Sequence, residues 1–196
     1  MGDAPKRFGY YRRLSRAQKR IYDESDEWGA IELEDPGALA PLAGAIGEAL
    51  AADDRVGTER ASRELVRGIC DQLNVPSPSA RVLAVRPRSA SAELHGLYVR
   101  EPDARPVLMV WMRTAQNERP VAHRTFVRTL AHEVGHHLDY ELLELEDSFH
   151  THGFFQRESS LVRQLLGRGR PKVQTPVAPP TELVREPTDP QLVLPW

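Results

Sequence analysis

The chain has 196 residues, a formal net charge of −2 and a hydrophobic content of 40%. This length suits one domain of about 150 residues with additional segments, and the hydrophobic content is sufficient for a buried core. The nearly balanced charge argues against a general affinity for nucleic acid, and the single cysteine, Cys70, excludes an internal disulfide.

The cysteine content and the apolar runs of the sequence indicate the compartment. A lone cysteine is typical of a reducing compartment, and Cys70 lies in a predicted helix, where we interpret it as a small core residue. The sequence shows neither the apolar stretch of a secretory signal nor a run of membrane-spanning length. We therefore expect a cytoplasmic protein that does not enter a membrane.

Residues 1–35 are predicted to form a charged segment that is basic first and acidic afterwards. The basic side chains recur at helical spacing at Arg12, Arg13, Arg16, Lys19 and Arg20, and the acidic ones follow at Asp23, Glu24, Asp26 and Glu27. The favoured interpretation is a solvated helix whose charges partly neutralise one another. The weaker alternative is that Arg12–Arg20 form a docking surface for an acidic partner such as DNA.

Residues 36–167 carry the patterns of a folded domain. The predicted helices span 38–52, 54–73 and 153–166, with one more that begins near Ala122 or His123, and the predicted strands span 81–86, 94–99 and 107–112. This order predicts an α+β fold with N-terminal helices, a small and mainly antiparallel sheet, and two C-terminal helices.

Residues 168–196 differ in composition from the rest. They are rich in proline and contain few large apolar residues before the last six, which predicts an extended or disordered tail. The apolar end, Leu192–Trp196, is expected to dock on the parent domain. A role in binding a partner or in occupying a cleft is the weaker alternative.

Residues 132–136 read His-Glu-Val-Gly-His, within the helix predicted to begin near Ala122. Positions i and i+4 lie one turn apart on one face of a helix, so His132 and His136 can bind the same metal ion. Zn²⁺ accepts imidazole nitrogens, and a catalytic zinc site has three protein ligands and one open position for water. Glu133 can then act as the general base that takes a proton from this water.

The helix around this motif is amphipathic. Six aliphatic residues fall on one stripe at 100° per residue: Val127, Leu130, Val134, Leu138, Leu142 and Leu145. His132 and His136 lie on the opposite side, so we expect the stripe to pack into the domain. Asp139, one turn beyond His136, is expected either to accept the second ring N–H of His136 or to be an exposed acid. His137 lies at the margin of the stripe and is interpreted as structural.

A catalytic zinc site requires a third protein ligand, and three downstream residues are candidates. Glu158 lies in the apolar stripe of the predicted helix Gly153–Leu166, where a buried carboxylate needs a cationic partner. A zinc ion would meet that need, and so would Arg128. His150 and His152 precede this helix and point the same way in an extended backbone, so either can replace Glu158. We favour Glu158 as the third ligand.

The stretch Leu94–Leu166 resembles a zincin metallopeptidase, in particular the compact ImmA/IrrE-type and SprT-like domains. The resemblance rests on His95-Gly96-Leu97-Tyr98, on the apolar run Val107–Met112 and on Thr129–His136, in this order. It implies a zincin-like domain in which a strand, here Val107–Met112, borders the cleft and pairs with an extended peptide substrate.

The resemblance also bears on the third ligand. In gluzincins the third ligand is a Glu on the following helix, at a distance comparable with that of Glu158. In SprT-like proteins it is a His shortly before that helix, with an aromatic residue four positions later, and His150 with Phe154 fits this spacing. The resemblance therefore leaves both choices open.

The sequence predicts a zinc-dependent metallopeptidase that hydrolyses a protein or peptide substrate, with Glu133 as the general base. The alternative is a non-catalytic zinc-binding module with a regulatory role, which would engage a partner through the basic N-terminal segment or the apolar tail. The intact Glu133 argues against the alternative, because a purely structural zinc does not need this carboxylate.

Overall fold

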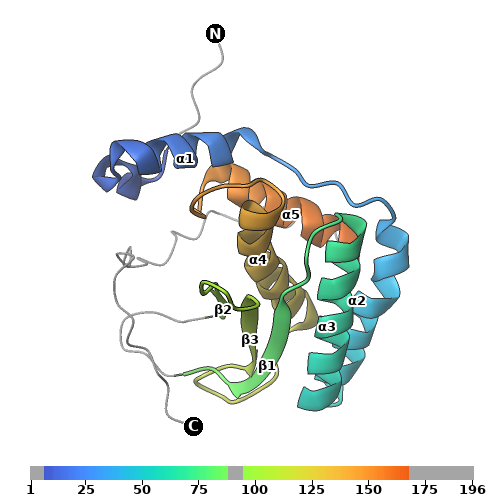
Figure 1. The fold of residues 1–196 in the computed structure, drawn as a ribbon. Helices are drawn as coiled ribbons and strands as arrows, with labels where there is room; N and C mark the ends of the chain where they lie inside the picture. The colour runs from blue at the N-terminus through green and yellow to red at the C-terminus, as the bar shows by residue number, and fades with distance from the viewer. Residues whose placement is uncertain (1–6, 88–94, 168–196) are drawn as a thin grey trace.

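The computed structural model describes residues 7–87 and 95–167. In chain order the elements are η1 (Gly9–Arg13, a 3₁₀-helix), α1 (Arg16–Glu27), α2 (Pro36–Ala51), α3 (Arg55–Gln72), β1 (Ser79–Val85), β2 (Gly96–Val99), β3 (Val107–Arg113), α4 (His123–Glu141) and α5 (His152–Leu166) (Figure 1). The α+β fold class is confirmed. The predicted proline-rich tail 168–196 and its apolar end, Leu192–Trp196, lie outside the described residues.

Side-chain caps fix where most of the helices begin. Ser15 forms a capping box with Gln18 at the start of α1, and Asp35 caps α2, in which Pro36 occupies the first turn. Asp54 and Thr151 cap α3 and α5 through their side-chain oxygens. Such residues satisfy amide groups that have no partner within the helix, so the chain sets the helix boundaries locally.

The three strands form a mixed sheet in the order β1-β3-β2. β1 pairs with β3 in parallel, from Ser79↔Val107 to Val85↔Arg113, and β2 pairs with β3 antiparallel, from Gly96↔Val110 to Val99↔Val107. The expectation of a mainly antiparallel sheet is therefore wrong. The expectation that Val107–Met112 borders the cleft and pairs with a substrate is also wrong, because β3 is the central strand and both of its edges are paired. Its continuous apolar run is typical of a strand whose two faces are both covered.

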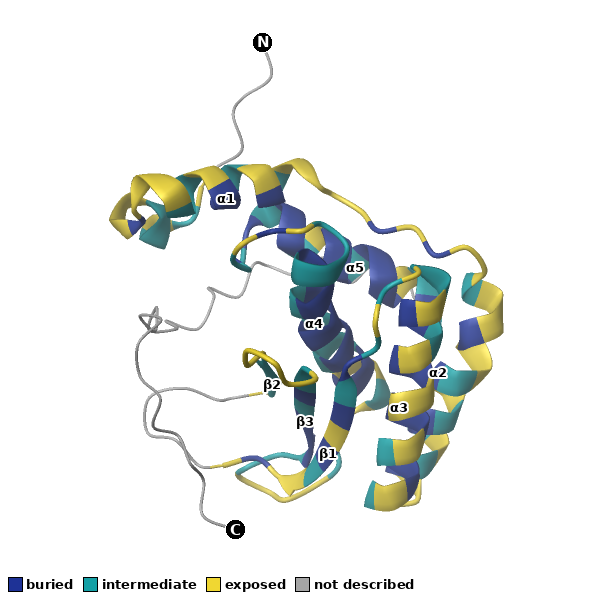
Figure 2. Cartoon of the chain, viewed as in Figure 1, coloured by how far each residue is buried: buried dark blue, intermediate teal, exposed yellow. Residues whose placement is uncertain are grey.

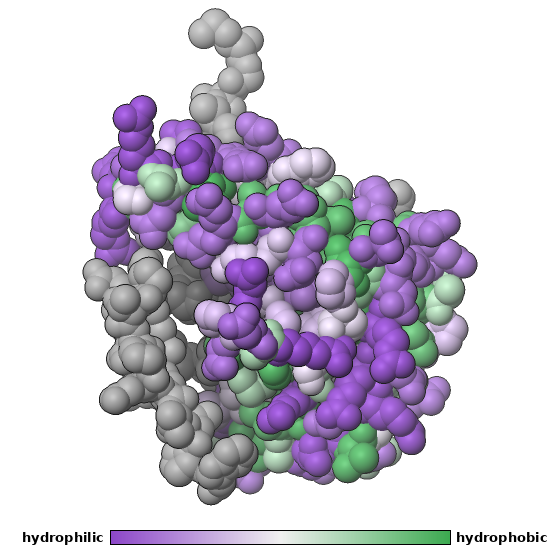
Figure 3. Space-filling model, viewed as in Figure 1, coloured by the Kyte–Doolittle hydropathy of each residue, from purple (hydrophilic) through white to green (hydrophobic). Residues whose placement is uncertain are grey.

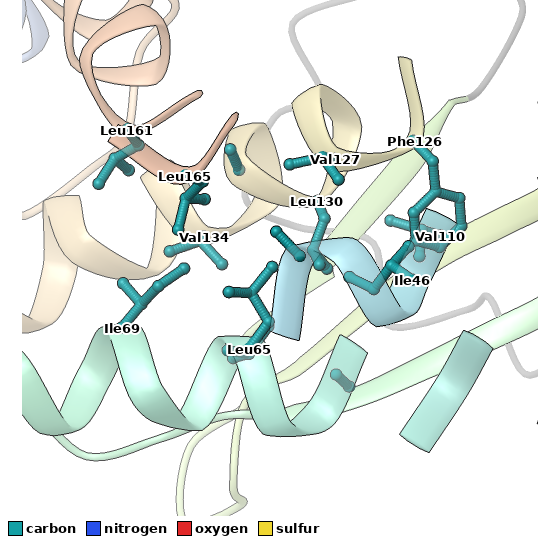
Figure 4. Close-up of a cluster of buried hydrophobic side chains, with 14 of the residues drawn as sticks. Ile46, Leu65, Ile69, Val110, Phe126, Val127, Leu130, Val134, Leu161 and Leu165 are labelled. Atoms are coloured by element: carbon teal, nitrogen blue, oxygen red, sulfur yellow. The ribbon is translucent and has the colours of Figure 1, made fainter. Parts of the chain in front are cut away.

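The main core lies between the sheet and the four helices α2–α5. α4 packs on β2, β3 and α5, while α2 packs on α3, α4 and α5. Figure 4 shows side chains from α2, α3, β3, α4 and α5 meeting in this core, among them Ile46, Leu65, Val110, Leu130 and Leu161, all of them buried. The aliphatic stripe of α4 faces this core from Val127 to Leu138, as expected. Leu142 and Leu145 lie beyond the end of α4 at Glu141.

A second, smaller core joins the N-terminal helices to the loop between α4 and α5. It consists of Leu14, Ile21, Tyr22, Leu145 and Phe149. Figure 2 shows that α1 is exposed on its outer side and buried where it approaches α5. Trp28, by contrast, is 50% exposed. The division of the chain at residue 35 stays a prediction, but residues 8–28 pack closely on the part that carries the histidines.

The surface and the helices give two further observations. Hydrophilic side chains cover much of the face over α1 and α3 in Figure 3, with apolar side chains scattered among them. Among the described residues, no helix combines the length and the apolar character needed to cross a membrane.

Candidate metal centre

Three histidine side chains converge at one point on the surface of α4. The Nε2 atom of His150 lies 2.9 Å from Nε2 of His132 and 3.1 Å from Nε2 of His136. The rings of His132 and His136 have centroids 5.0 Å apart. One ring nitrogen from each of the three lies within 4.8 Å of the others, and this group could hold a metal ion.

The chain brings these rings together from two places. His132 and His136 lie one turn apart on α4, as the motif predicts. His150 comes from the loop 142–151, directly before Thr151, which caps α5. The ring of Phe154, on the first turn of α5, has its centroid 4.7–5.1 Å from all three imidazole centroids. Phe154 is only 1% exposed, so the cluster rests on a rigid apolar surface.

Glu158 is not a member of this cluster. Its Oε2 atom accepts a hydrogen bond from Nδ1 of His132 at 3.0 Å, on the far side of the ring from His150. Arg128 approaches the same carboxylate, with Nε 3.5 Å from Oε1. The structure therefore brings His150, the alternative candidate, and not the favoured Glu158, into the group with His132 and His136. The carboxylate is buried, as expected, but a ring N–H and a guanidinium partner it.

Nδ1 of His136 is held by Ser148. The distance from His136 Nδ1 to Ser148 Oγ is 2.7 Å, and Ser148 Oγ in turn donates to Asp139 Oδ2 at 2.7 Å. The sequence left two alternatives for Asp139, an exposed acid or a direct partner of His136, and both are wrong. It acts through Ser148, because the side chain of Asp139 is directed to the buried guanidinium of Arg157, 2.7 Å away.

Asp139 and Arg157 form a buried ion pair behind the histidines. Both side chains are 1% exposed or less. Burial raises the pKa of Asp139, and the adjacent Arg157 and the hydrogen bond from Ser148 oppose this rise. Asp139 accepts a hydrogen bond on each carboxylate oxygen, one from Arg157 and one from Ser148. The hydroxyl proton of Ser148 therefore points to Asp139. Ser148 Oγ is then left to accept from His136.

These partners fix the tautomers of two rings. A carboxylate and an already donating hydroxyl can only accept, so His132 and His136 each carry a proton on Nδ1 and a lone pair on Nε2. Burial and the neighbouring His132 and His150 lower the pKa of His136 well below its ordinary value. One N–H on His150 cannot satisfy two lone pairs at once, whereas a cation satisfies all three nitrogens.

The donor set fits a zinc ion. Three imidazoles are a known catalytic set for Zn²⁺, and nitrogens about 2.0–2.1 Å from one zinc ion are roughly 3.3 Å from one another in a tetrahedral arrangement. The observed separations of 2.9 Å and 3.1 Å are close to this value. The hydrogen bonds to the outer nitrogens of His132 and His136 are those that orient zinc-binding imidazoles.

Glu133 follows His132 on α4, and its side chain lies against the start of β2. It is 5% exposed and buried between α4 and the sheet. A Cβ atom built on Gly96, the first residue of β2, would overlap the Glu133 carboxylate. Only glycine therefore leaves room for the carboxylate in this position, which ties Gly96 of the quoted His95-Gly96 pair to the motif helix.

Two other histidines near the motif, His152 and His137, have structural partners. His152 was a candidate ligand, but its ring stacks on Phe8 with centroids 4.6 Å apart and is not part of the cluster. His137 is 1% exposed. Its Nε2 donates to the carbonyl of Pro76 at 2.7 Å, which leaves Nδ1 to accept from the Tyr98 hydroxyl at 3.1 Å. Its interpretation as a structural residue agrees with these contacts.

The basic residues of the N-terminal segment lie apart from this centre. Arg12, Arg13, Arg16 and Arg20 are exposed, Lys19 lies over the ring of Tyr11, and Arg20 Nη2 lies 3.7 Å from Glu146 Oε2. Sequence reasoning missed Ser148 and Tyr10, whose hydroxyl donates to the carbonyl of His150 at 2.8 Å. Neither residue belongs to a periodic pattern, so the sequence carried no signal for them.

Three comparisons were made with known proteins. No family model, no curated protein and no solved structure matches the chain.

Proposed function

We propose that this protein is a zinc-dependent metallopeptidase with a zincin-like domain, in which His132, His136 and His150 hold the metal. The observation that carries the proposal is the convergence of the Nε2 atoms of the three histidines, with the outer nitrogens of His132 and His136 hydrogen-bonded. The buried Glu133 follows His132 directly on α4. A structural zinc site normally has four protein ligands, whereas three ligands leave a position open for substrate or water. Glu133 has no place in a purely structural site.

When bound, zinc would polarise the scissile carbonyl and make an attacking water molecule more acidic. Glu133 follows His132 directly on α4 and would take the proton of this water as general base, and then give it to the leaving amine. Burial of Glu133 against Gly96 limits the positions open to its carboxylate. Fixed placement of a base is a large part of its catalytic effect.

The substrate is proposed to be an extended segment of a protein or peptide that pairs with β2. Within residues 7–87 and 95–167, β2 pairs on one side only, with β3, and α4 packs beside it. An edge strand offers backbone donors and acceptors to an added chain. β2 begins at Gly96, next to Glu133, so a paired substrate would lie close to the general base.

The proposal is tested with the variant Glu133→Gln. The parent protein should bind one equivalent of zinc and cleave casein or an unstructured peptide. Glu133→Gln should bind zinc with unchanged affinity and lose about 10²- to 10⁴-fold in cleavage rate, the usual contribution of a general base. Glu141→Gln, the same chemical change at the last residue of α4, is the matched control and should cleave at the parental rate.

Two results would contradict the proposal. A parent protein that binds zinc but cleaves neither substrate would favour the non-catalytic module. Failure of the parent to bind zinc at all would remove the basis of both functions.

A further inference from the structure

The loop 142–151 carries His150 but contains no helix or strand. Its backbone hydrogen bonds lie towards its two ends. The amide of Leu145 donates to the backbone carbonyl of Asp139, and the amide of Thr151 donates to the backbone carbonyl of Phe149. An irregular loop of this kind loses little by moving, so contacts with other elements must hold the third ligand in place. Besides the contacts of Ser148 with α4 and of Phe154 with His150, several contacts come from the N-terminal segment, more than a hundred residues away.

The most direct contact is made by Tyr10 of η1. Its hydroxyl donates to the backbone carbonyl of His150 at 2.8 Å. The ring of Tyr10 is itself held, since it lies 5.8 Å edge-on from the buried ring of Tyr22 and 6.3 Å from the ring of Phe8. The hydrogen bond therefore comes from a packed side chain and restrains the backbone of the ligand residue itself.

Apolar packing supports the same loop. Leu14, Ile21 and Tyr22 bury Leu145 and Phe149, which precede His150 in the loop. Phe8 stacks on His152, on the other side of His150. The loop is thus covered by η1 and α1 on both sides of the third ligand.

The C-terminal end of α1 reaches the second ligand by a different route. Arg157 Nη1 donates to the carbonyls of Ser25 and Trp28, at 2.6 Å and 2.7 Å. The carbonyls at the end of a helix have no partner within it and bear partial negative charge. Arg157 links them to Asp139, and Asp139 holds Ser148 against His136.

The start of α5 is attached to α1 as well. Asp26 Oδ1 accepts from the amide of Gly153 at 2.7 Å, and Ser25 Oγ lies 3.3 Å from Thr151 Oγ1. A Cβ atom on Gly153 would approach the backbone of Ser25 and Asp26 to within 2.5–3.0 Å. The close approach of α1 to the residues that follow His150 therefore depends on this glycine.

We propose that η1 and α1 form a positioning element of the metal centre, and that Tyr10 positions the third ligand through the carbonyl of His150. This inference rests on the metal centre of the proposed function, but not on peptidase activity. It assigns a role to a segment whose charge pattern favoured a solvated helix. Tyr10 is a positioning residue, because it acts on the metal through His150.

The test compares Tyr10→Phe with Tyr11→Phe. Both variants keep the ring and remove one hydroxyl from η1, but the Tyr11 hydroxyl donates to Asp23 within the N-terminal segment and does not contact the loop. Zinc affinity is measured by competition with a chelator, and the unfolding temperature of the metal-free form is measured alongside. The Co²⁺ form provides a visible spectrum that reports coordination geometry.

Tyr10→Phe should lower zinc affinity by about threefold to tenfold, the range expected for one lost hydrogen bond, and should change the Co²⁺ spectrum. Tyr11→Phe should keep parental affinity and spectrum. Parental zinc affinity in Tyr10→Phe, or equal losses in the two variants, would overturn the positioning role and leave the peptidase proposal intact. A parent that binds zinc without cleaving peptides would overturn only the peptidase proposal.

Discussion

Glu158 Oε2 and His132 Nδ1 lie 3.0 Å apart, and this hydrogen bond leaves the Nε2 lone pair of His132 directed at His150. The carboxylate thus acts on the proposed metal through the imidazole, by fixing its tautomer and raising its basicity. It also lies 3.5 Å from the guanidinium of Arg128, which compensates its charge within the domain.

This arrangement predicts different effects for Glu158 and His150. Glu158→Gln keeps the metal ligands and weakens one hydrogen bond, so zinc affinity should fall about 10- to 100-fold. His150→Ala removes a ligand and should abolish stoichiometric zinc binding at micromolar protein. Both are measured by chelator competition on purified protein. Glu158→Gln with the larger loss of the two would show that Glu158, not His150, binds the metal.

The sequence favoured Glu158 over His150 for a physical reason. The sequence indicated a carboxylate on the apolar stripe of α5, and such a group needs a partner of opposite charge or a hydrogen-bond donor. Glu158 is indeed buried, at 6% exposure. Periodicity cannot distinguish a metal ion from a ring N–H as that partner, because the choice depends on where the loop 142–151 places His150.

Local patterns predicted the elements well, and non-local pairing was missed. The helix expected to begin near Ala122 or His123 begins at His123, and the one expected over 153–166 spans His152–Leu166. The parallel pairing of β1 with β3 was not predicted, since β2 lies between them in the chain and no local signal specifies a partner. The hydrogen bond of Tyr10 was missed for the same reason, as its partner lies 140 residues away.

Gly96→Ala is predicted to impair catalysis without loss of metal. The added methyl group would overlap the Glu133 carboxylate and force it to move, whereas the three histidines would stay in place. A displacement of about 1 Å can cost about 10²-fold in rate, so the cleavage rate should fall by that order while zinc affinity is retained. Gly44→Ala on α2, where an added Cβ meets nothing within 4 Å, is the control and should stabilise the fold by about 0.5–1 kcal/mol. Unaltered cleavage by Gly96→Ala would argue against Glu133 as the base.

The buried pair of Asp139 and Arg157 is predicted to be strongly coupled. Asp139→Asn leaves Arg157 charged in a site where it is 1% exposed, so the free energy of unfolding should fall by about 3–5 kcal/mol. Arg157→Met should cost a similar amount, and the double variant should cost less than the sum, with a coupling of about 0.5–3 kcal/mol. Urea unfolding in the presence of chelator gives the free energy of unfolding of the parent, the two single variants and the double variant. Additive losses would mean that the two side chains do not interact in solution.

Stability of the metal-free protein is predicted to fall below neutral pH. Burial lowers the pKa of His137 in the folded state, and burial together with His132 and His150 lowers that of His136 still further. The unfolded chain takes up protons near pH 6.5, before the folded chain does, so folding is favoured above that pH and weakened as the pH falls below it. Each group can contribute up to about 1.4 kcal/mol per pH unit. Urea unfolding with chelator at about pH 7.5, 6.5 and 5.5 measures this slope. A free energy of unfolding that stays constant over this range would show that these rings are already accessible to water.

Cys70 provides a check on the core that is independent of the metal centre. Its side chain is fully buried in α3, and burial raises the pKa of the thiol to about 12. Only about one thiol in 10⁴ is then ionised near pH 8, and the thiolate is the reactive form. The native protein should therefore react with an aromatic disulfide reagent at least about 10³-fold more slowly than the same protein in guanidinium chloride. Reaction of native protein at the rate of the unfolded chain would mean that α3 does not pack into the core as described, because burial is what excludes the reagent.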